Sequence, residues 1–314
     1  MNFRKPKFWD LEKPNFISRI LAIFTLPILI NNIFLDFKKR NKDKRIKKIC
    51  IGNIYIGGTG KTPTTIKLYE ILNRLKLNVS TGKKFYKSQL DEISLLRNKT
   101  SLITESSRSK IIQKAIETGK DLIIFDDGLQ DKNINYDLQF VCFDAENWIG
   151  NGQLIPSGPL REKLSSIKKY DVVFLKKKNN DLKNIYYQLK KCNPQIKIFN
   201  TSYKPINIDK FDSTKKYIIF SGIGNPDDFK NILINNNIKP IDEIIFPDHY
   251  SFKKDDINNI KNRAKDLNSE IITTEKDYLR ISSEDRKDIN FLEIKLEIEN
   301  ENELINYIKS NLNV

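Results

Sequence analysis

Residues 49–65 read ICIGNIYIGGTGKTPTT, which runs from an apolar strand into a glycine-rich turn and ends in Gly-Lys-Thr. Backbone amides in such a turn, with the N-terminus of the following helix, can surround phosphate oxygens. We expect the Lys61 ammonium to reach the β- and γ-phosphates of a nucleotide and the Thr62 hydroxyl to bind Mg²⁺. The strict phosphate-loop pattern has glycine where this chain has Tyr55. The predicted ATP-binding residues are Tyr55, Ile56, Gly57, Gly58, Thr59, Gly60, Lys61 and Thr62.

An acidic pair follows a second apolar run. The sequence DLIIFDDGLQ (121–130) gives four apolar residues and then Asp126 and Asp127, the form of a Walker B strand end. One of these carboxylates should hold Mg²⁺ directly or through water. The alternative is a strand that simply ends in an Asp-Gly turn, and the phosphate loop upstream favours the metal-binding role.

Short strand-like runs alternate with helical patterns along most of the chain. This alternation predicts an α/β protein with a P-loop NTPase-type parallel sheet domain, an N-terminal membrane-associated helix and a second, smaller α/β domain. The strand-like runs cover 47–54, 121–127, 138–145, 171–177, 215–222 and 269–277, and helical patterns include 62–75 and 255–267. The expected parts are 1–37 for the membrane-anchoring helix, 38–205 for the kinase domain and 206–314 for the smaller domain.

Composition narrows the possible partners. The 314-residue chain carries a formal charge of +15, which indicates either a solvated basic surface or an anionic partner such as nucleic acid, a phosphorylated substrate or membrane lipid. No nucleic-acid partner is expected, because the lysines are spread out and no recognition motif is present. Cys50, Cys142 and Cys192 are scattered without a CxxC pair, and His249 is the single histidine. Neither a disulfide framework nor multi-histidine metal chemistry is therefore indicated.

The N-terminal region combines apolar and basic segments. Residues 16–37 contain an apolar core from Ile20 to Ile30 that is short for a membrane span, and residues 38–48 hold eight basic side chains and one acid. This order predicts an interfacial anchor on an anionic membrane surface. A buried helix with a charged linker and a single membrane span are the two alternatives.

Seven motifs occur in the order found in one family. They are GNIYIGGTGKTPT, DEISLL, FDDGLQ, NGQLIPSGPLRE, FSGIGNPDDF, FPDHYSF and TTEKDYLRI, and the resemblance covers roughly residues 16–281, most of the chain. The chain thereby resembles the tetraacyldisaccharide 4′-kinases, which phosphorylate a lipid A precursor. The resemblance implies transfer of the ATP γ-phosphate, with Mg²⁺, to the 4′-hydroxyl of an acylated disaccharide phosphate lipid. It also implies a location on the cytoplasmic face of the bacterial inner membrane, peripheral or anchored by a single helix.

The resemblance also implies site residues. Asp91 is similar to the family's general base, and Glu92 resembles a metal-associated acid; both lie where we expect a strand end. His249 is the implied partner of Asp91. Arg161 and Asn151 are candidates for substrate binding, because a guanidinium suits bidentate phosphate contacts. A surface ion pair with the neighbouring Glu162 is the alternative role for Arg161.

Three departures from the family pattern affect the acceptor side. Asp131 and Tyr250 stand where the family commonly has histidine, and STGKKFYKSQL (80–90) is shorter than the family's glycine-rich stretch. Lys83 and Lys84 are candidates for the positive charge that this stretch otherwise lacks. Two alternative functions stay open at this point: a phosphate-loop kinase for a different, soluble acceptor, and a membrane-recruited ATP-binding switch.

Overall fold

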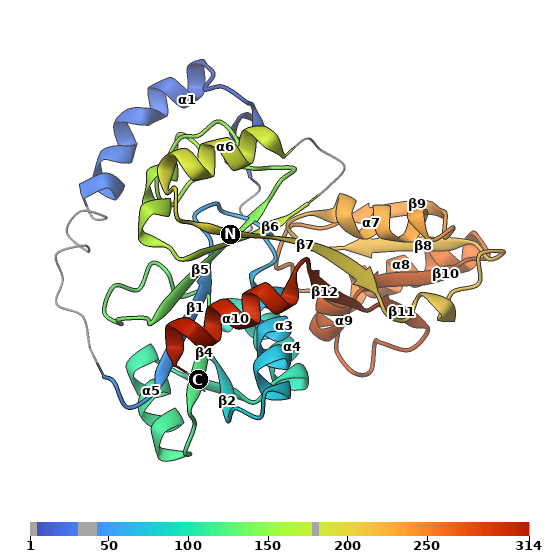
Figure 1. The fold of residues 1–314 in the computed structure, drawn as a ribbon. Helices are drawn as coiled ribbons and strands as arrows, with labels where there is room; N and C mark the ends of the chain where they lie inside the picture. Colours follow the sequence, from blue (N-terminus) through green and yellow to red (C-terminus); the bar gives the residue numbers. More distant parts are fainter. Residues whose placement is uncertain (1–4, 31–42, 178–181, 314) are drawn as a thin grey trace. The chain divides into compact units, whose positions relative to one another are not determined.

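The computed structural model describes residues 5–30, 43–177 and 182–313 (Figure 1). The chain forms two compact units. The larger unit comprises Lys5–Phe85, Lys99–Ser202 and Leu296–Val314, and the smaller comprises Tyr86–Asn98 and Tyr203–Lys295. The division at 202/203 lies close to the boundary expected after residue 205. In contrast to the expected parts, residues 86–98 belong with the smaller unit and residues 296–314 with the larger one.

The large sheet has eight strands in the order β12-β7-β6-β5-β1-β4-β2-β3. The paired registers from β7 to β3 are all parallel, as the alternating pattern predicts. The strand bounds are Lys47–Gly52 (β1), Val79–Lys84 (β2), Leu102–Glu105 (β3), Leu122–Asp126 (β4), Leu138–Asp144 (β5), Val172–Lys176 (β6), Lys197–Pro205 (β7) and Ile294–Ile298 (β12).

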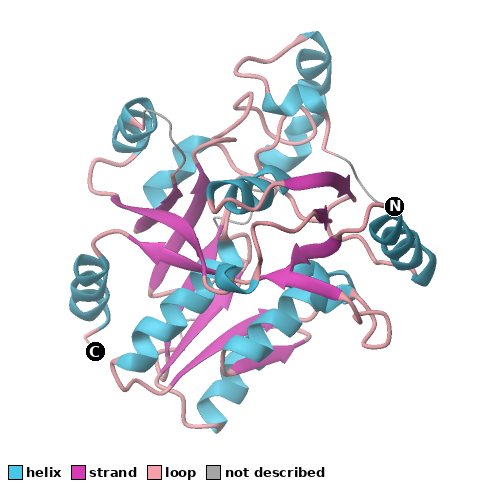
Figure 2. Cartoon of the chain, turned by 90° about the vertical axis from the view of Figure 1, so that its right-hand side faces the viewer, coloured by secondary structure: helices cyan, strands magenta, loops and turns pink. Residues whose placement is uncertain are grey.

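The central strands are apolar because both of their faces are buried. Every residue of β4 and β6 is buried, and in β1 only the first residue is partly exposed. Figure 2 shows the strands in magenta with the helices in cyan around them. Continuous runs of Val, Ile, Leu and Phe are typical of parallel strands covered on both sides. The helices of this unit are α3 (Lys61–Arg74), α5 (Arg108–Glu117), α6 (Lys183–Cys192) and α10 (Glu301–Leu312), with the 3₁₀ segment η4 (Leu164–Lys169).

The smaller unit contains a four-stranded parallel sheet in the order β11-β10-β8-β9. Its apolar core packs on both faces of this sheet, with Phe229 of one helix and Ile257 of another among the buried residues. The elements are α4 (Leu90–Lys99), β8 (Tyr217–Ser221), α7 (Pro226–Asn235), β9 (Pro240–Ile245), α8 (Lys254–Asp266), β10 (Glu270–Thr274), α9 (Glu275–Arg280) and β11 (Ile289–Leu292), with the 3₁₀ turns η3 (Lys87–Gln89) and η5 (Ile208–Lys210).

The N-terminal segment of the larger unit buries polar side chains and exposes apolar ones. After η1 (Lys7–Asp10) come α1 (Phe16–Leu21), η2 (Ala22–Thr25) and a further helical stretch at 26–30. The polar residues Ser18 and Thr25 are buried, whereas seven large apolar side chains between residues 16 and 30 are exposed. The exposed apolar set, called here the N-terminal apolar face, is Phe16, Ile17, Ile20, Ile23, Phe24, Leu26 and Ile30.

Part of the predicted anchor lies outside the described residues. This applies to residues 31–37 of the apolar segment and to residues 38–42 of the basic run. Over the described ranges, no helix combines the length and the apolar character needed to cross a membrane. Cys50, Cys142 and Cys192 are free.

Candidate active site

The glycine-rich turn leads directly into helix α3. Gly57 has a φ of 138° and Gly60, the residue before the helix, has a φ of 82°. Both values lie in a region that residues with a side chain rarely adopt, which explains glycine at these positions. Lys61 and Thr62 form the first turn of α3, so the free amides of the helix N-terminus face the same turn. The turn thus has the backbone form of a phosphate-binding loop.

Asp126, at the end of β4, lies beside the start of α3. Its Oδ2 accepts a hydrogen bond from Thr62 Oγ1 at 3.1 Å, and its Oδ1 accepts one from Thr65 Oγ1 at 3.3 Å. The Lys83 ammonium, from the end of β2, donates to Oδ2 at 2.7 Å. Strand β4 lies between β1 and β2 in the sheet, and this order brings the three segments together.

These side chains fit a magnesium ion. A hydroxyl from the loop and a carboxylate from the neighbouring strand end are hard oxygen donors, the type that Mg²⁺ prefers. Thr62 and Asp126, both predicted as metal-binding residues, are in contact, and Lys83 supplies one positive charge at the same carboxylate oxygen.

Asp127 is surrounded by basic side chains. Its carboxylate lies 4.0 Å from Lys61 Nζ and 3.2 Å from Arg161 Nη1, and its backbone carbonyl accepts a hydrogen bond from Arg108. Arg161 therefore pairs with Asp127, while the alternative partner Glu162 accepts hydrogen bonds from two other side chains, Gln130 and Tyr170. Three cations converge at the end of β4, as a site for polyanionic phosphates requires.

Tyr55 has a structural role at the start of the loop. Its side chain is buried, and its hydroxyl accepts a hydrogen bond from Lys5 at 2.7 Å and donates one to Asp10 at 3.0 Å. Its backbone pairs with Leu160, and the next residue, Ile56, donates from its amide to the Pro159 carbonyl at 2.8 Å. Segment 151–162 is thus hydrogen-bonded to the start of the phosphate loop.

The side chain of Asn151 forms hydrogen bonds within segment 151–162 and to the N-terminal segment. Its Nδ2 donates to the Ser157 carbonyl at 3.0 Å, to Ser18 Oγ at 3.2 Å and to the Phe8 carbonyl at 3.2 Å. Its Oδ1 accepts from the Gln153 amide at 3.1 Å. These hydrogen bonds attach the N-terminal segment to the loop 151–158, and the substrate role of Asn151 stays a prediction.

The predicted base lies in the smaller unit. Asp91 and Glu92 occupy the first turn of α4 rather than the expected strand end, so that expectation was wrong. A short 3₁₀ turn and the helix follow β2, and the buried face of the helix carries Asp91 inward. His249, on the loop after β9, has Nδ1 3.4 Å from Asp91 Oδ2 and Nε2 3.8 Å from Glu92 Oε1. The separation of 3.4 Å is an ion-pair distance and is long for a hydrogen bond.

Helix α9 supplies two cations to this cluster. Arg280 donates two hydrogen bonds to Asp91 Oδ2, from Nη2 at 2.6 Å and from Nε at 3.1 Å. Lys276 Nζ lies 3.3 Å from the same oxygen and 3.2 Å from Glu92 Oε1. We call Asp91, Glu92, His249, Lys276 and Arg280 the Asp91 cluster.

The charge balance of the cluster decides the protonation of Asp91. Burial by itself would raise the pKa of this carboxyl, but His249, Lys276 and Arg280 outweigh it and hold the pKa well below its ordinary value. Burial would likewise lower the pKa of Lys276, but the nearby carboxylates raise it above its usual range. Asp91 is thus an anion and Lys276 a cation at neutral pH.

Two functional candidates were not singled out by their sequence pattern. Arg280 stands inside the TTEKDYLRI motif without a role of its own there, and Arg108 lies in no motif, whereas Lys83 was one of two candidate charges. Arg108 Nη1 pairs with Asp131 Oδ2 at 3.0 Å. Asp131, which stands where the family commonly has histidine, therefore has its charge neutralised by Arg108 within the larger unit.

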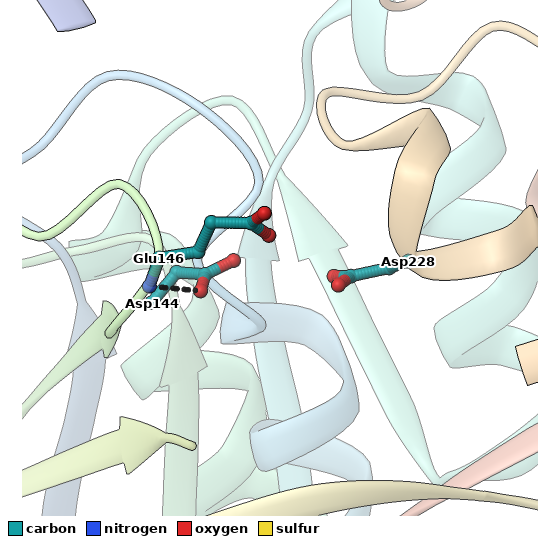
Figure 3. Close-up of side chains that lie close together, drawn as sticks. All are labelled: Asp144, Glu146 and Asp228. Carbon is teal, nitrogen blue, oxygen red and sulfur yellow. Dashed lines mark hydrogen bonds between the residues drawn. The ribbon is translucent and has the colours of Figure 1, made fainter. Parts of the chain in front are cut away.

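Other acids at the end of β5 have a different environment. Asp144 is buried and pairs with Lys176 Nζ at 2.5 Å, and its Oδ1 accepts a hydrogen bond from the Glu146 amide at 3.0 Å (Figure 3). Asp228, also drawn there, belongs to the first turn of α7 in the smaller unit. The Lys176 ammonium therefore neutralises the buried Asp144 carboxylate.

Comparisons with known proteins agree over nearly the whole chain. The family model "Tetraacyldisaccharide-1-P 4'-kinase" matches residues 22–313. A tetraacyldisaccharide 4′-kinase of Pelagibacter ubique is 45% identical over 98% of this chain and 97% of its own length. That of Rickettsia canadensis is 33% identical over 95% and 94%. The crystal structure of an apo form of LpxK from Aquifex aeolicus in complex with ATP has a TM-score of 0.69 at 22% identity, covering 94% of this chain and 99% of that one.

Proposed function

This chain belongs to the tetraacyldisaccharide-1-P 4′-kinase family, and we propose that its phosphate loop and its Asp91 cluster together carry out the transfer of phosphate from ATP to the 4′-hydroxyl of the acylated disaccharide 1-phosphate. In this reaction the hydroxyl oxygen forms a bond to the γ-phosphorus while the bond to the β–γ bridging oxygen breaks. ADP leaves, and the hydroxyl proton must go to a base.

The larger unit supplies the nucleotide site in this proposal. Backbone amides of the glycine-rich turn 57–60 and of the first turn of α3 bind the phosphates, whereas the Ile56 amide stays bonded to the Pro159 carbonyl. The Lys61 ammonium contacts the β- and γ-phosphates. Thr62 and Asp126 would hold Mg²⁺, which would supply positive charge beside the phosphate oxygens. Arg161, now paired with Asp127, is close enough to the loop to contact a phosphate of either substrate.

The smaller unit supplies the base. Asp91 takes the proton of the attacking 4′-hydroxyl, and His249 and Lys276 stabilise the negative charge of the carboxylate before the transfer. A lowered pKa makes Asp91 a weak base, but a weak base suffices when the transition state is loose and little proton transfer precedes bond breaking. Glu92, between Lys276 and His249, keeps the net charge of the cluster close to neutral.

The observation that carries this proposal is the contact among Thr62, Asp126 and the first turn of α3, since it joins the loop and the Walker B carboxylate as phosphate transfer requires. The test is transfer of labelled phosphate from ATP to tetraacyldisaccharide 1-phosphate in detergent with Mg²⁺. Lys61→Ala serves as the inactive control. Equal or faster transfer to a fully deacylated disaccharide phosphate would favour a soluble acceptor, and ATP hydrolysis without transfer would favour a switch.

We further propose that the N-terminal apolar face binds a membrane that contains anionic lipid. Ile23 and Phe24 are 75% and 62% exposed, whereas Ser18 on the opposite side is fully buried. Ser18 Oγ lies 2.9 Å from Ser157 Oγ and donates to the Ser157 carbonyl at 2.6 Å, so the polar side of the segment is fixed to the protein. An apolar face held outward in this manner is typical of an interfacial anchor.

Vesicle flotation tests the membrane proposal. Full-length protein should float with vesicles of phosphatidylglycerol and phosphatidylethanolamine and less with phosphatidylcholine alone, because the chain is basic. Ile23→Glu/Phe24→Glu should abolish flotation. Tyr187→Glu, at a side chain of α6 that is 66% exposed, is the matched control and should float like the wild type. Equal flotation of both variants would contradict the assignment of this face.

A further inference from the structure

The carboxylate of Asp91 is held through one of its two oxygens. Both hydrogen bonds that it accepts come from Arg280, at 2.6 and 3.1 Å, and both end on Oδ2. The nearest approaches of Lys276 and His249 are also to Oδ2, at 3.3 and 3.4 Å. Among the described residues, no hydrogen bond ends on Oδ1. The cluster thus fixes the carboxylate and leaves Oδ1 without a hydrogen-bond donor.

Arg280 is itself held in place on its other side. Its Nη1 donates to Asp277 Oδ1 at 2.7 Å and to the Gly222 carbonyl at 2.6 Å. Asp277 is fully buried, and its Oδ2 accepts from the Gly222 amide at 3.0 Å and from Thr274 Oγ1 at 2.7 Å. The guanidinium therefore joins Asp91 to the end of β8 and the start of α9 through a series of short bonds, with little freedom to rotate.

We propose that Arg280 is a positioning residue for phosphate transfer, which fixes Asp91 through Oδ2 so that Oδ1 is the oxygen that receives the proton of the acceptor hydroxyl. This inference rests on the proposed role of Asp91 as base. A planar guanidinium suits the task because its donors point in fixed directions, two toward Asp91 and one toward Asp277. A lysine ammonium in its place could keep the charge but could not reach both carboxylates with this geometry.

The charged groups around Asp91 predict how its titration depends on Arg280. Helix α9 presents Lys276, Asp277 and Arg280, the loop after β9 presents Asp248 and His249, and α4 itself presents Glu92. Burial raises the pKa of Asp91, and its contacts with His249, Lys276 and Arg280 more than reverse this effect. Removal of Arg280 leaves the burial and takes away one cation, so the pKa of Asp91 should move upward toward its ordinary range.

The experiment compares three full-length variants with the wild type. In Arg280→Gln, kcat should fall by about 10- to 100-fold at neutral pH, the size expected for a misplaced catalytic group, while the KM for ATP changes little. The acid limb of its kcat/KM profile, which reports the base of the free enzyme, should move to higher pH. Arg280→Lys should keep the acid limb near that of the wild type yet show a reduced kcat.

The matched control is Arg263→Gln. Arg263 lies on α8 of the same unit, is largely exposed and donates to Asp242 at 3.0 Å. This variant should retain wild-type kcat and the wild-type acid limb. Circular dichroism and thermal unfolding check that every variant is folded; if Arg280→Gln is not, the test is Arg280→Lys, which must lose kcat while it retains the acid limb.

Several outcomes would overturn the inference. They are an unchanged kcat in Arg280→Gln, a loss of kcat without movement of its acid limb, and an equal loss in Arg263→Gln. Failure of the wild type to transfer phosphate is a different result, because it refutes the proposed function. In that case ¹³C-carboxyl NMR, assigned with Asp91→Asn, still tests the contact: the Asp91 titration should move to higher pH in Arg280→Gln, and no movement refutes it.

Discussion

Replacement of Lys83 by methionine should destabilise the larger unit strongly. Lys83 and Asp126 form an ion pair at 2.7 Å whose side chains are 2% and 0% exposed. Methionine retains much of the length and apolar stem of lysine but has no charge. The substitution therefore leaves the Asp126 carboxylate buried without its cation, which is the costly way to break a buried pair.

The structure sets the expected magnitude. Loss of one partner of a buried ion pair costs about 3–5 kcal/mol. Thr62 and Thr65 still donate one hydrogen bond to each oxygen of Asp126, so we expect a value near the lower end, about 3 kcal/mol. For a unit of roughly 200 residues, about 2–4 °C of Tm corresponds to 1 kcal/mol, which predicts a fall in Tm of about 6–12 °C.

The assay is thermal unfolding of the full chain with EDTA and without nucleotide. Lys197→Met is the control, because Lys197 pairs with Glu303 at a similar distance of 3.0 Å while both side chains are about half exposed. Such an exposed pair is worth at most about 1 kcal/mol. The double variant Lys83→Met/Asp126→Asn should regain part of the lost stability, since it also removes the buried charge.

A second measurement uses the proposed metal site. Millimolar Mg²⁺ in place of EDTA should raise the Tm of Lys83→Met more than that of the wild type, because the ion would restore a cation at Asp126. The reasoning is refuted if Lys83→Met loses no more stability than Lys197→Met. It is also refuted if the double variant is less stable than Lys83→Met alone, because the buried charge would then not be the cause.

The remaining predictions concern phosphate transfer. Lys61→Ala should lower kcat by about 10²-fold or more through loss of transition-state charge stabilisation, measured with labelled ATP; a change in KM alone would contradict this role. Asp91→Asn should reduce kcat more than His249→Ala does, as the histidine only supports the base; an equal or reversed order would overturn the two assignments. Arg161→Lys should raise KM for one of the two substrates several-fold, since lysine lacks the planar fork, and unchanged constants would leave Arg161 only its pair with Asp127.

The chain's local patterns determine the phosphate loop and the class of fold. Gly57 and Gly60 occupy backbone conformations that glycine adopts readily, and the apolar run before them forms β1 with its residues buried. The run that ends in Asp126 and the helical pattern after Thr62 also form as predicted. Such features depend on neighbouring residues and on periodicity, which a sequence displays directly.

The division into units is not a local property. Residues 86–98 belong to the smaller unit, although in the sequence they come between β2 and β3 of the large sheet. Residues 296–314 belong to the larger unit, although they follow the last strand of the smaller one. No change of composition marks these crossings, and we placed a single boundary near residue 205 because Pro205 and the polar residues after it resemble a linker. Packing partners, and not linker composition, decide to which core α4 and α10 belong.

The ion pairs of the site depend most on the tertiary structure. Lys83 pairs with Asp126, 43 residues away in the sequence, because β2 and β4 are neighbours in the sheet. Arg280 pairs with Asp91, 189 residues away, because both residues belong to the smaller unit. From the sequence alone each of these charges could equally have faced solvent. Residue types and their spacing along the chain thus determined which phosphate chemistry is possible. Strand order and helix packing decided which charges are buried together. Burial matters because two charges attract each other more strongly away from water, however far apart they lie in the sequence.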